Sequence, residues 1–200
     1  ACARASTTPW FFVVDADNWI RDGFDFAVPF TPAADEIAVW GATNPFNDLY
    51  YGHGGIKLLP VSVFVAADAE VHARDSLDFT VTIARNRFID RKASEHRFNT
   101  SAYGTWGAVF RECAKLASAA RRGSLKARAI TNHRLKSWLN VNPEARFAEW
   151  CRRGAEDGIL YGRTFSRDPA ALNRINDFAW MRAAFRARYE AESACPPKAG

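Results

Sequence analysis

The strongest constraint on the fold is the order in which two hydrophobic patterns follow each other along the chain. Short apolar runs, which are typical of strands, are confined to the first half, and 3.6-residue patterns fill the chain from about residue 105. The runs predict strands at 10–14, at 37–41, at 77–83 and on either side of a glycine-rich bend within 49–59. The first of them is continuous enough to be buried on both faces. Strands followed by helices indicate an α/β or α+β fold in which helices pack on a mixed sheet.

Capping residues mark where the helices of the second half are expected to begin. They predict helix starts at Thr105, near His133, at Asn142 and at Asp168, the last two because a proline follows the cap. The helix that follows Asn142 is expected to end near Gly158. With 200 residues and 48% hydrophobic content, the chain suits one domain over residues 1–190, followed by a flexible tail at 191–200.

Charge and cysteine content narrow the classes of partner. The formal net charge of +5 favours anionic partners such as nucleotide phosphates, nucleic acid or acidic lipid headgroups. No apolar run approaches the roughly 18 residues of a membrane span, so we expect no membrane partner. The four cysteines lack metal-binding spacing, and Cys113 and Cys151 fall in helical apolar patterns. We therefore expect these two to be free core thiols in a reducing compartment.

Two carboxylates follow the first predicted strand directly. Asp15 and Asp17 are two residues apart, so a strand-like backbone aims both side chains to one side, at the end of the sheet where α/β proteins bind ligands. Such close carboxylates repel each other unless a cation lies between them, and Mg²⁺ or Mn²⁺ prefers oxygen ligands that it shares with substrate phosphates. The alternative is that residues 15–18 only turn the chain and cap the next segment. The residues alone leave both interpretations open.

A buried strand, an Asp-x-Asp motif and a glycine-rich strand form a layout that resembles the GT-A class of glycosyltransferases. Several blocks also resemble phage-encoded enzymes that attach sugars to DNA bases, relatives of the base J-associated glucosyltransferase; these blocks are TTPWFFVVDADN, WGATNPFNDLYYGHGGIKLLP, FNTSAYGTWGAVFRECAKL and INDFAWMRAAF. The resemblance implies a metal-dependent enzyme that moves a hexose or pentose from a UDP-sugar or similar donor. The implied acceptor is the hydroxyl of a modified DNA base such as 5-hydroxymethylcytosine, in the cytoplasm of an infected or host bacterial cell.

The resemblance also implies roles for particular residues. Asp15 and Asp17 would hold Mn²⁺ or Mg²⁺ and the donor diphosphate, with His133 as a further metal ligand, unless His133 merely lies near a helix N-cap. Glu112 is the candidate general base, and an Arg–Glu pair that ties helix to sheet is the alternative. The glycine-rich segment would line the sugar and acceptor site. Residues expected to bind substrate are Asn18, Asn44, His53, Gly54, Gly55, Lys57, Thr100, Ser101, Trp106 and Arg111.

Local chemistry supports part of this set and offers plainer explanations for it. The glycines of residues 52–55 permit close backbone approach and positive φ, and a β-bulge or tight hairpin is the alternative. Thr100 and Ser101 precede a predicted helix, whose free N–H groups bind phosphates or sugar hydroxyls, although ordinary capping explains them equally. His72 and His96 lie in segments that read as polar loops, and we assign them no role.

The resemblance is incomplete at the N-terminal side. GT-A enzymes place two or more nucleotide-binding βα units before the Asp-x-Asp strand, whereas only fourteen residues precede Asp15. Those units are therefore largely absent, and we expect the chain to be a piece of a longer polypeptide. The alternatives are that another subunit completes the site or that the protein is a degenerate relative.

Two other function classes stay open on the residues. A non-catalytic nucleic-acid-binding module is suggested by a basic stretch, unless this is only a solvated helix face; it comprises Arg121, Arg122, Lys126, Arg128, Arg134 and Lys136. A metal-dependent nuclease or phosphatase would need further carboxylates beside Asp15 and Asp17. The available ones, none with a telling spacing, are Asp48, Glu70 and Asp75.

Overall fold

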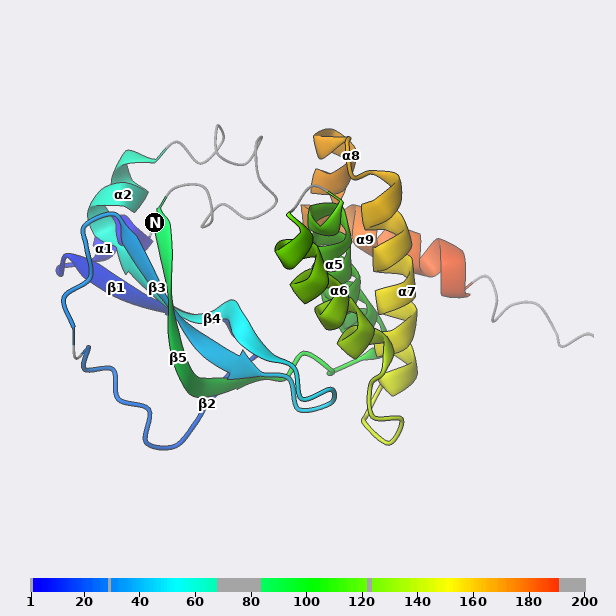
Figure 1. Cartoon of the computed structure of the whole chain (residues 1–200), viewed down its shortest axis with the longest axis horizontal. Coiled ribbons are helices and arrows are strands. Elements are labelled where there is room, and N and C mark those ends of the chain that lie inside the picture. Colours follow the sequence, from blue (N-terminus) through cyan, green and yellow to red (C-terminus); the bar gives the residue numbers. More distant parts are fainter. Residues whose placement is uncertain (1, 29, 68–83, 122–123, 191–200) are drawn as a thin grey trace, which may run out of the picture. The chain divides into compact units, whose positions relative to one another are not determined.

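A computed structural model describes residues 2–28, 30–67, 84–121 and 124–190 (Figure 1). The chain divides into two compact units, Ala1–Phe98 and Asn99–Gly200. The first contains a mixed five-stranded sheet and the second is helical, so a mixed α/β composition is confirmed. A GT-A-type fold and a single domain over residues 1–190 stay predictions. The strand expected at 77–83 and the tail at 191–200 lie outside the described residues.

Three strands of the sheet run in the same direction. The strand order is β1-β4-β3-β5-β2, with bounds Trp10–Val14 (β1), Asn18–Ile20 (β2), Glu36–Thr43 (β3), Tyr50–Pro60 (β4) and Arg85–His96 (β5). Strand β4 is antiparallel to both β1 and β3, whereas β3 and β5 are parallel. Consequently β1, β3 and β5 have their carboxyl ends at one end of the sheet, which is where the Asp-x-Asp motif follows β1.

The sheet is strongly curled, because its two edge strands are consecutive in the sequence. In a flat sheet, the four steps of about 4.8 Å between β1 and β2 would separate them by about 19 Å. The link from Val14 to Asn18 spans at most about 14 Å even when fully extended. The curling brings Asn18 of β2 against Gly55 of β4, where a Cβ atom would overlap the Asn18 side-chain amide. Gly55 therefore has a steric reason to lack a side chain.

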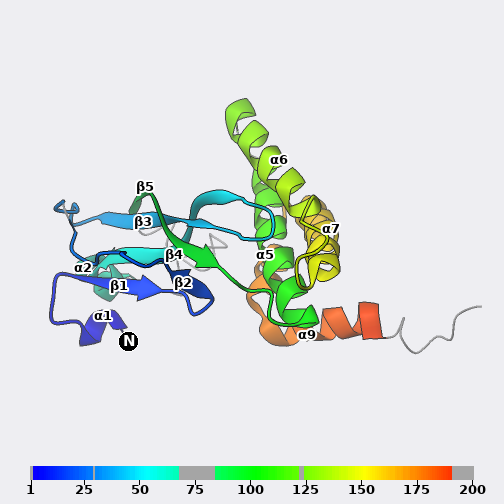
Figure 2. The same cartoon turned by 90° about the horizontal axis from the view of Figure 1, so that it is seen from below.

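The centre of the sheet is buried on both faces, but its edge is not. On one face Trp40 packs against Phe12 and against Phe24 and Phe30 from the segment that links β2 to β3. On the other face Phe64 of α2 (Val61–Ala66) contacts Phe11 of β1. Helix α1 (Cys2–Ala5) lies beside α2 in Figures 1 and 2. Among the strands that the structure describes, β1 pairs only with β4, and it is half-buried throughout, so its expected burial on both faces is wrong.

The glycine-rich segment forms a bulge within β4. Trp40 pairs with Ile56 and Ala42 pairs with Tyr51, so two steps along β3 correspond to five along β4. The extra residues interrupt the pairing within one continuous strand. The structure thus confirms the β-bulge alternative and corrects the expected strand, bend and strand. Neither Gly52 nor Gly55 uses the positive φ that a glycine permits.

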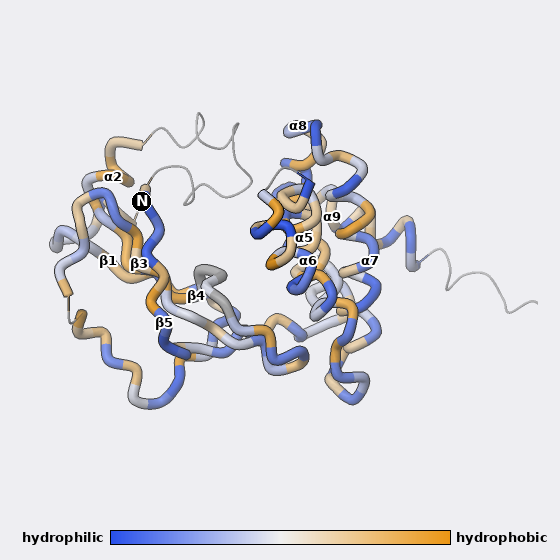
Figure 3. Tube along the Cα trace, in the orientation of Figure 1, coloured by the Kyte–Doolittle hydropathy of each residue, from blue (hydrophilic) through white to orange (hydrophobic). Residues whose placement is uncertain are grey.

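The helical unit is built around two closely packed helices. Its elements are α5 (Ala102–Ala120), α6 (Leu125–Leu139), α7 (Ala148–Thr164), α8 (Pro169–Asn173), the 3₁₀ turn η1 (Arg174–Asn176), α9 (Phe178–Phe185) and the π-helical turn η2 (Arg186–Glu190). Helix α5 packs against α7, and α6 packs against both, as Figure 2 also shows. In Figure 3, α5 is largely hydrophobic, whereas α6 carries many hydrophilic residues. Helix α5 therefore contributes many of the side chains in the core of this unit.

Glycines on one stripe of α7 permit this close packing. Gly154, Gly158 and Gly162 are four residues apart, and a Cβ atom on any of them would collide with a backbone carbonyl of α5. The carbonyls belong to Trp106, Phe110 and Ala114, which share the same spacing. The two backbones approach closely at three successive turns, so these glycines are required by packing rather than by backbone angle.

Several predicted helix boundaries need correction. The cap of α5 is Ser101, whose Oγ accepts from Gly104 N at 3.0 Å, and Thr105 is fully buried inside the helix. The next helix begins at Leu125, well before His133. Asn142 begins a turn rather than a helix: α7 starts only at Ala148, and it continues past its expected end to Thr164. Asn142 instead closes a turn, in which Ala145 N donates to its carbonyl at 3.0 Å and Glu144 N donates to its side-chain oxygen at 3.0 Å.

Two other predictions for this unit are confirmed. Asp168 caps α8, accepting from Ala171 N at 3.0 Å, with Pro169 at the first helical position. Cys113 and Cys151 are free and buried. Burial raises the pKa of Cys151 to about 12, so this thiol stays protonated at neutral pH.

Candidate functional site

The Asp-x-Asp motif forms a tight turn between β1 and β2. Asn18 N donates to Asp15 O at 2.9 Å, which closes the turn. The backbone is held on both sides, since Asp15 N donates to Gly55 O at 2.9 Å and Arg97 N donates to Asp17 O at 2.7 Å. The interpretation that these residues turn the chain is therefore confirmed. The three hydrogen bonds that hold the turn are all between backbone groups.

Each carboxylate of the turn has a basic neighbour. Asp15 Oδ2 lies 3.9 Å from Lys57 Nζ on β4, and Asp17 Oδ2 lies 2.9 Å from His96 Nε2 at the end of β5. The Asp15 and Asp17 side chains are 43% and 42% exposed, so both are open to a ligand from solvent. The hydrogen bond from His96 holds the pKa of Asp17 below its usual value, despite the opposing effect of partial burial. Asp17 is thus an anion at neutral pH.

Polar side chains from the neighbouring strands surround the turn. Asn18 is buried; its Oδ1 accepts from Ser94 Oγ at 3.0 Å, and its Nδ2 donates to Asp17 Oδ1 at 3.3 Å. Asn44 directly follows β3, where Thr43 is paired with Glu95, the residue before His96. The carboxyl ends of β1, β3 and β5 therefore bring acidic, amide and imidazole groups to one end of the sheet.

Asn44 is an unusual member of this group. It is fully buried, and within the part of the chain that the structure describes neither amide atom of its side chain has a hydrogen-bond partner. A buried polar atom left without a partner costs about 1–3 kcal/mol. Such a group is uncommon in a native fold and marks a position whose polarity needs an explanation beyond packing.

The turn offers two half-exposed carboxylates, which are oxygen ligands of the kind that a divalent cation takes. Among the described residues no three His, Cys, Asp or Glu side chains gather in a cluster that could hold a metal alone. Mg²⁺-type sites commonly use one or two carboxylates and complete their shell with substrate phosphates and water. Asp15 and Asp17 offer that minimum, and His96 is a further nitrogen donor beside Asp17. A metal would have to compete with Lys57 for Asp15 and with His96 for Asp17.

Other predicted residues of the sheet unit are placed only in part. Lys57 lies beside the turn as expected, and Gly55 gives the close approach predicted for the glycine-rich segment. His53 and Gly54 belong to β4, but their side-chain positions lie outside what the structure describes. Asp48 has a positive φ of 53° in the turn before β4, and the two other candidate carboxylates, Glu70 and Asp75, fall outside the described residues.

The predicted residues of the helical unit occupy ordinary structural positions. Glu112 lies 4.0 Å from Lys115 on the same helix, and Arg111 donates to Asn176 Oδ1 at 3.0 Å. Trp106 is 2% exposed and donates from Nε1 to Asp157 at 2.9 Å, which is the position of a core side chain. His133 is exposed in the middle of α6, so its expected place at a helix start is wrong.

The capping interpretation also holds at the start of α5. Ser101 is the N-cap of this helix, as described above, and Thr100 is exposed just before it. Both remain candidates for substrate binding, since a capping side chain leaves other N–H groups of the first turn for a ligand. Their relation to the Asp-x-Asp turn, like that of Glu112 and His133, stays a prediction.

His96 is the site residue that sequence reasoning missed. It was assigned to a polar loop, whereas it is the last residue of β5 and lies 79 positions from its partner Asp17. No local spacing connects the two, because the contact depends on β5 pairing with β2. The available signal was weak: an alternating polar segment that ends in histidine.

Comparisons with protein-family models, with curated proteins and with solved structures gave no match to this chain. Among the described residues, no helix combines the length and the apolar character needed to cross a membrane. Function must therefore be argued from the site itself.

Proposed function

We propose that this chain carries the metal- and acceptor-side part of a nucleotide-sugar glycosyltransferase, with a hydroxyl of a modified DNA base as acceptor. The observation that carries the proposal is the pair of half-exposed carboxylates at the carboxyl end of β1, at the same end of the sheet as the ends of β3 and β5. Ligands of open α/β sheets bind in this position. The similarity in layout to GT-A enzymes supports the same assignment.

Each residue at the turn has a task that suits its chemistry. Asp15 and Asp17 would hold Mn²⁺ or Mg²⁺, which when bound stabilises the negative charge of a departing diphosphate. Lys57 adds a positive charge 3.9 Å from Asp15, so it would attract the same diphosphate. His96 orients the Asp17 carboxylate through their 2.9 Å contact. Glu112 remains the proposed general base for the acceptor hydroxyl.

Nucleic-acid binding without catalysis is the second candidate, and a specific observation favours it. Residues 113–143 contain seven Lys and Arg and no Asp or Glu. This stretch includes all of α6, whose first half is exposed. An acid-free basic surface of this kind suits a phosphate backbone. The transferase proposal uses the same surface for its acceptor, so the two candidates differ in turnover rather than in partner.

A transfer assay separates these candidates. The chain is incubated with Mn²⁺, a panel of nucleotide sugars and duplex DNA that contains 5-hydroxymethylcytosine, and the digested nucleosides are weighed by mass spectrometry. The proposal predicts a hexose- or pentose-sized gain on the modified nucleoside with at least one donor. DNA binding without a gain for any donor would leave only the binding module.

Matched variants test whether the turn carries the activity. The Asp15→Asn, Asp17→Asn double variant should lose the mass gain, because amides are poorer ligands for a hard cation than carboxylates. Asp22→Asn changes an exposed aspartate of the same unit and should retain full activity. Circular dichroism of the variants checks that both remain folded. Equal activity in the double variant and the wild type would refute the assigned site.

A further inference from the structure

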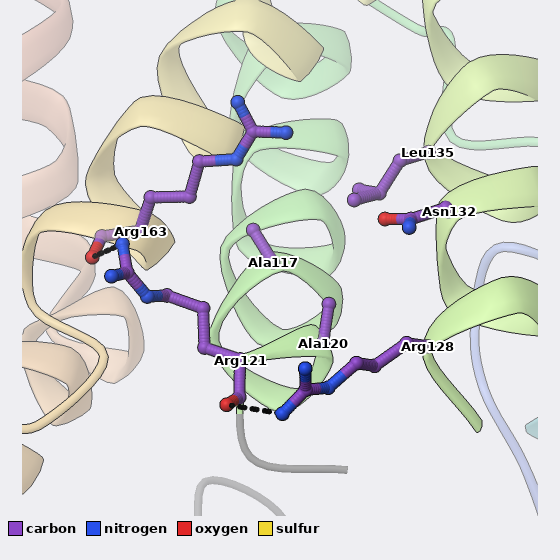
Figure 4. Close-up of a pocket in the computed structure, with 7 residues that line it drawn as sticks. All are labelled: Ala117, Ala120, Arg121, Arg128, Asn132, Leu135 and Arg163. Carbon is purple, nitrogen blue, oxygen red and sulfur yellow. Dashed lines mark hydrogen bonds between the residues drawn. The ribbon is translucent and has the colours of Figure 1, made fainter. Parts of the chain in front are cut away.

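An open pocket lined by exposed arginines, called the arginine cavity below, lies on the surface of the helical unit. It has a volume of about 350 Å³ and is bounded by the last turns of α5 and α7 and by α6 (Figure 4). Its lining residues include three arginines and no acid; they are Ala117, Ala120, Arg121, Arg128, Asn132, Leu135 and Arg163. At about 30 Å³ for each water in the liquid, there is room for a phosphate group and several ordered waters.

Two of the arginines are fixed in place by the backbone. Arg121 donates to the Arg163 carbonyl at 3.4 Å and Arg128 donates to the Arg121 carbonyl at 3.4 Å, which Figure 4 marks with dashed lines. These carbonyls belong to the ends of α7 and α5, where a basic side chain offsets the partial negative charge of the helix. Each of these bonds uses one of the five N–H donors of a guanidinium. These bonds orient both groups at the pocket.

Arg163 is different, because capping does not account for its side chain. Within the described residues, its guanidinium has no ion pair and no hydrogen-bond partner. It lines the same pocket as the other two arginines, and Figure 4 shows its side chain extending along α7, with its guanidinium away from those of Arg121 and Arg128. Three arginines and no acid around one pocket give it a positive potential, which suits an anion.

The surroundings extend this positive charge beyond the cavity. Residues 99–200 contain 18 Lys and Arg against nine Asp and Glu, a formal net charge of +9. Along α6 the basic residues run from Lys126 to Lys136, a distance of about 15 Å at 1.5 Å per residue. Successive phosphates of one DNA strand advance about 3.4 Å along the helix axis, so several of them match this length. A single small anion would leave most of these charges unused.

We propose that the cavity binds a backbone phosphate of DNA, with α6 following the same strand. The guanidinium fork suits two-point contact with phosphate oxygens, which a lysine cannot reproduce. The choice of DNA over free phosphate or a nucleotide rests on the proposed function. The inference adds a specific anchoring site to it, remote in sequence from the Asp-x-Asp turn.

The test is a measurement of binding that needs neither sugar donor nor metal. Fluorescence anisotropy gives the Kd of the full chain for a labelled, unmodified DNA duplex at 50 and 200 mM salt. Each phosphate contact makes Kd rise about 3.5-fold over this range, since the slope is about 0.9 per contact. Arg163→Gln should reduce the overall rise by that factor, and the Arg128→Gln, Arg163→Gln double variant by about its square.

Two further variants make the result specific. Arg167→Gln removes an exposed arginine of the same unit that does not line the cavity, so its salt dependence should stay closer to wild type. Arg163→Lys keeps the charge and should restore the salt dependence while binding more weakly than wild type. Circular dichroism confirms that each variant is folded. An unchanged salt dependence in the Arg163→Gln and double variants would overturn the proposal.

Competition identifies the source of the phosphate and separates this inference from the proposed function. Inorganic phosphate and UDP at millimolar concentration should displace the duplex only weakly. Tight binding of either in an Arg163-dependent manner, without DNA binding, would overturn the assignment to DNA. Arg163-dependent DNA binding without sugar transfer would retain this inference and remove the transferase. Sugar transfer that is unaffected by replacing Arg128 and Arg163 would retain the transferase and remove this inference.

Discussion

A buried aspartate holds the end of the helical unit together. Asp157 of α7 is 7% exposed and accepts hydrogen bonds from Trp106 Nε1 at 2.9 Å and from the Tyr189 hydroxyl. Arg188 forms an ion pair with its other oxygen at 2.9 Å. The network ties η2 to α5 and α7. Burial and the bond to Asp157 both raise the pKa of Tyr189, so its hydroxyl keeps its proton and remains a donor.

Replacing Asp157 with alanine should be strongly destabilising. It removes the acceptor that the donors of Trp106 and Tyr189 share, although these residues are only 2% and 8% exposed. Each unsatisfied buried donor costs about 1–3 kcal/mol. The Arg188 side chain is 57% exposed and can turn to water, so losing that pair adds little. We expect a total loss of about 3–5 kcal/mol in the free energy of unfolding.

Urea denaturation followed by circular dichroism at 222 nm measures this loss, because the long helices belong to the second unit. Glu156→Ala is the matched control: this acid is the neighbour of Asp157 on the exposed side of α7. Its effect should stay within about 0.5 kcal/mol. Asp157→Asn keeps an acceptor and should fall between the two. A midpoint for Asp157→Ala equal to that of Glu156→Ala would refute the argument.

The remaining predictions concern two glycines and one carboxylate. Gly158→Ala should lower the thermal midpoint, since its Cβ would strike the α5 backbone at a cost of about 1–3 kcal/mol. Gly107→Ala meets its nearest neighbour at 3.7 Å and should raise the midpoint through better helix propensity. A raised midpoint for Gly158→Ala, or a lowered one for Gly107→Ala, would contradict the packing. The folded-state pKa of Asp17 is lowered, so its stabilising contribution is present above the ordinary carboxyl value of 3.8 and is lost as pH falls through the folded value. Denaturation from pH 7 to pH 2 should therefore show Asp17→Asn destabilised at pH 7, with the gap closing below pH 3.8; a gap that is constant with pH would disprove the pairing with His96.

Local patterns predicted the elements of this fold better than their connections. The WFFVV run gave β1 and its carboxylate end, because five apolar residues before Asp-x-Asp are informative by themselves. Asp168-Pro169 gave the start of α8 for the same reason. Burial of β1 was overestimated, since an apolar run does not reveal whether a strand lies at an edge.

Features that depend on contacts between residues far apart in the sequence could not be predicted from local patterns. The bulge in β4 is defined by its register against β3, and the contact between Asp17 and His96 by the pairing of β2 with β5. The glycines of α7 look like helix breakers until α5 is placed against them. The arginine cavity likewise needs the ends of α5 and α7 beside α6, which no sequence spacing predicts.

The central claim is that the turn after β1 binds a divalent cation together with a nucleoside diphosphate. Electron paramagnetic resonance measures free Mn²⁺ directly, and it requires no catalysis. The account predicts that the wild-type chain lowers the free Mn²⁺ signal of an Mn²⁺–UDP mixture further than the Asp15→Asn, Asp17→Asn double variant does, with Asp22→Asn behaving as wild type. Identical Mn²⁺ signals for the wild type and the double variant, with both proteins folded, would contradict it.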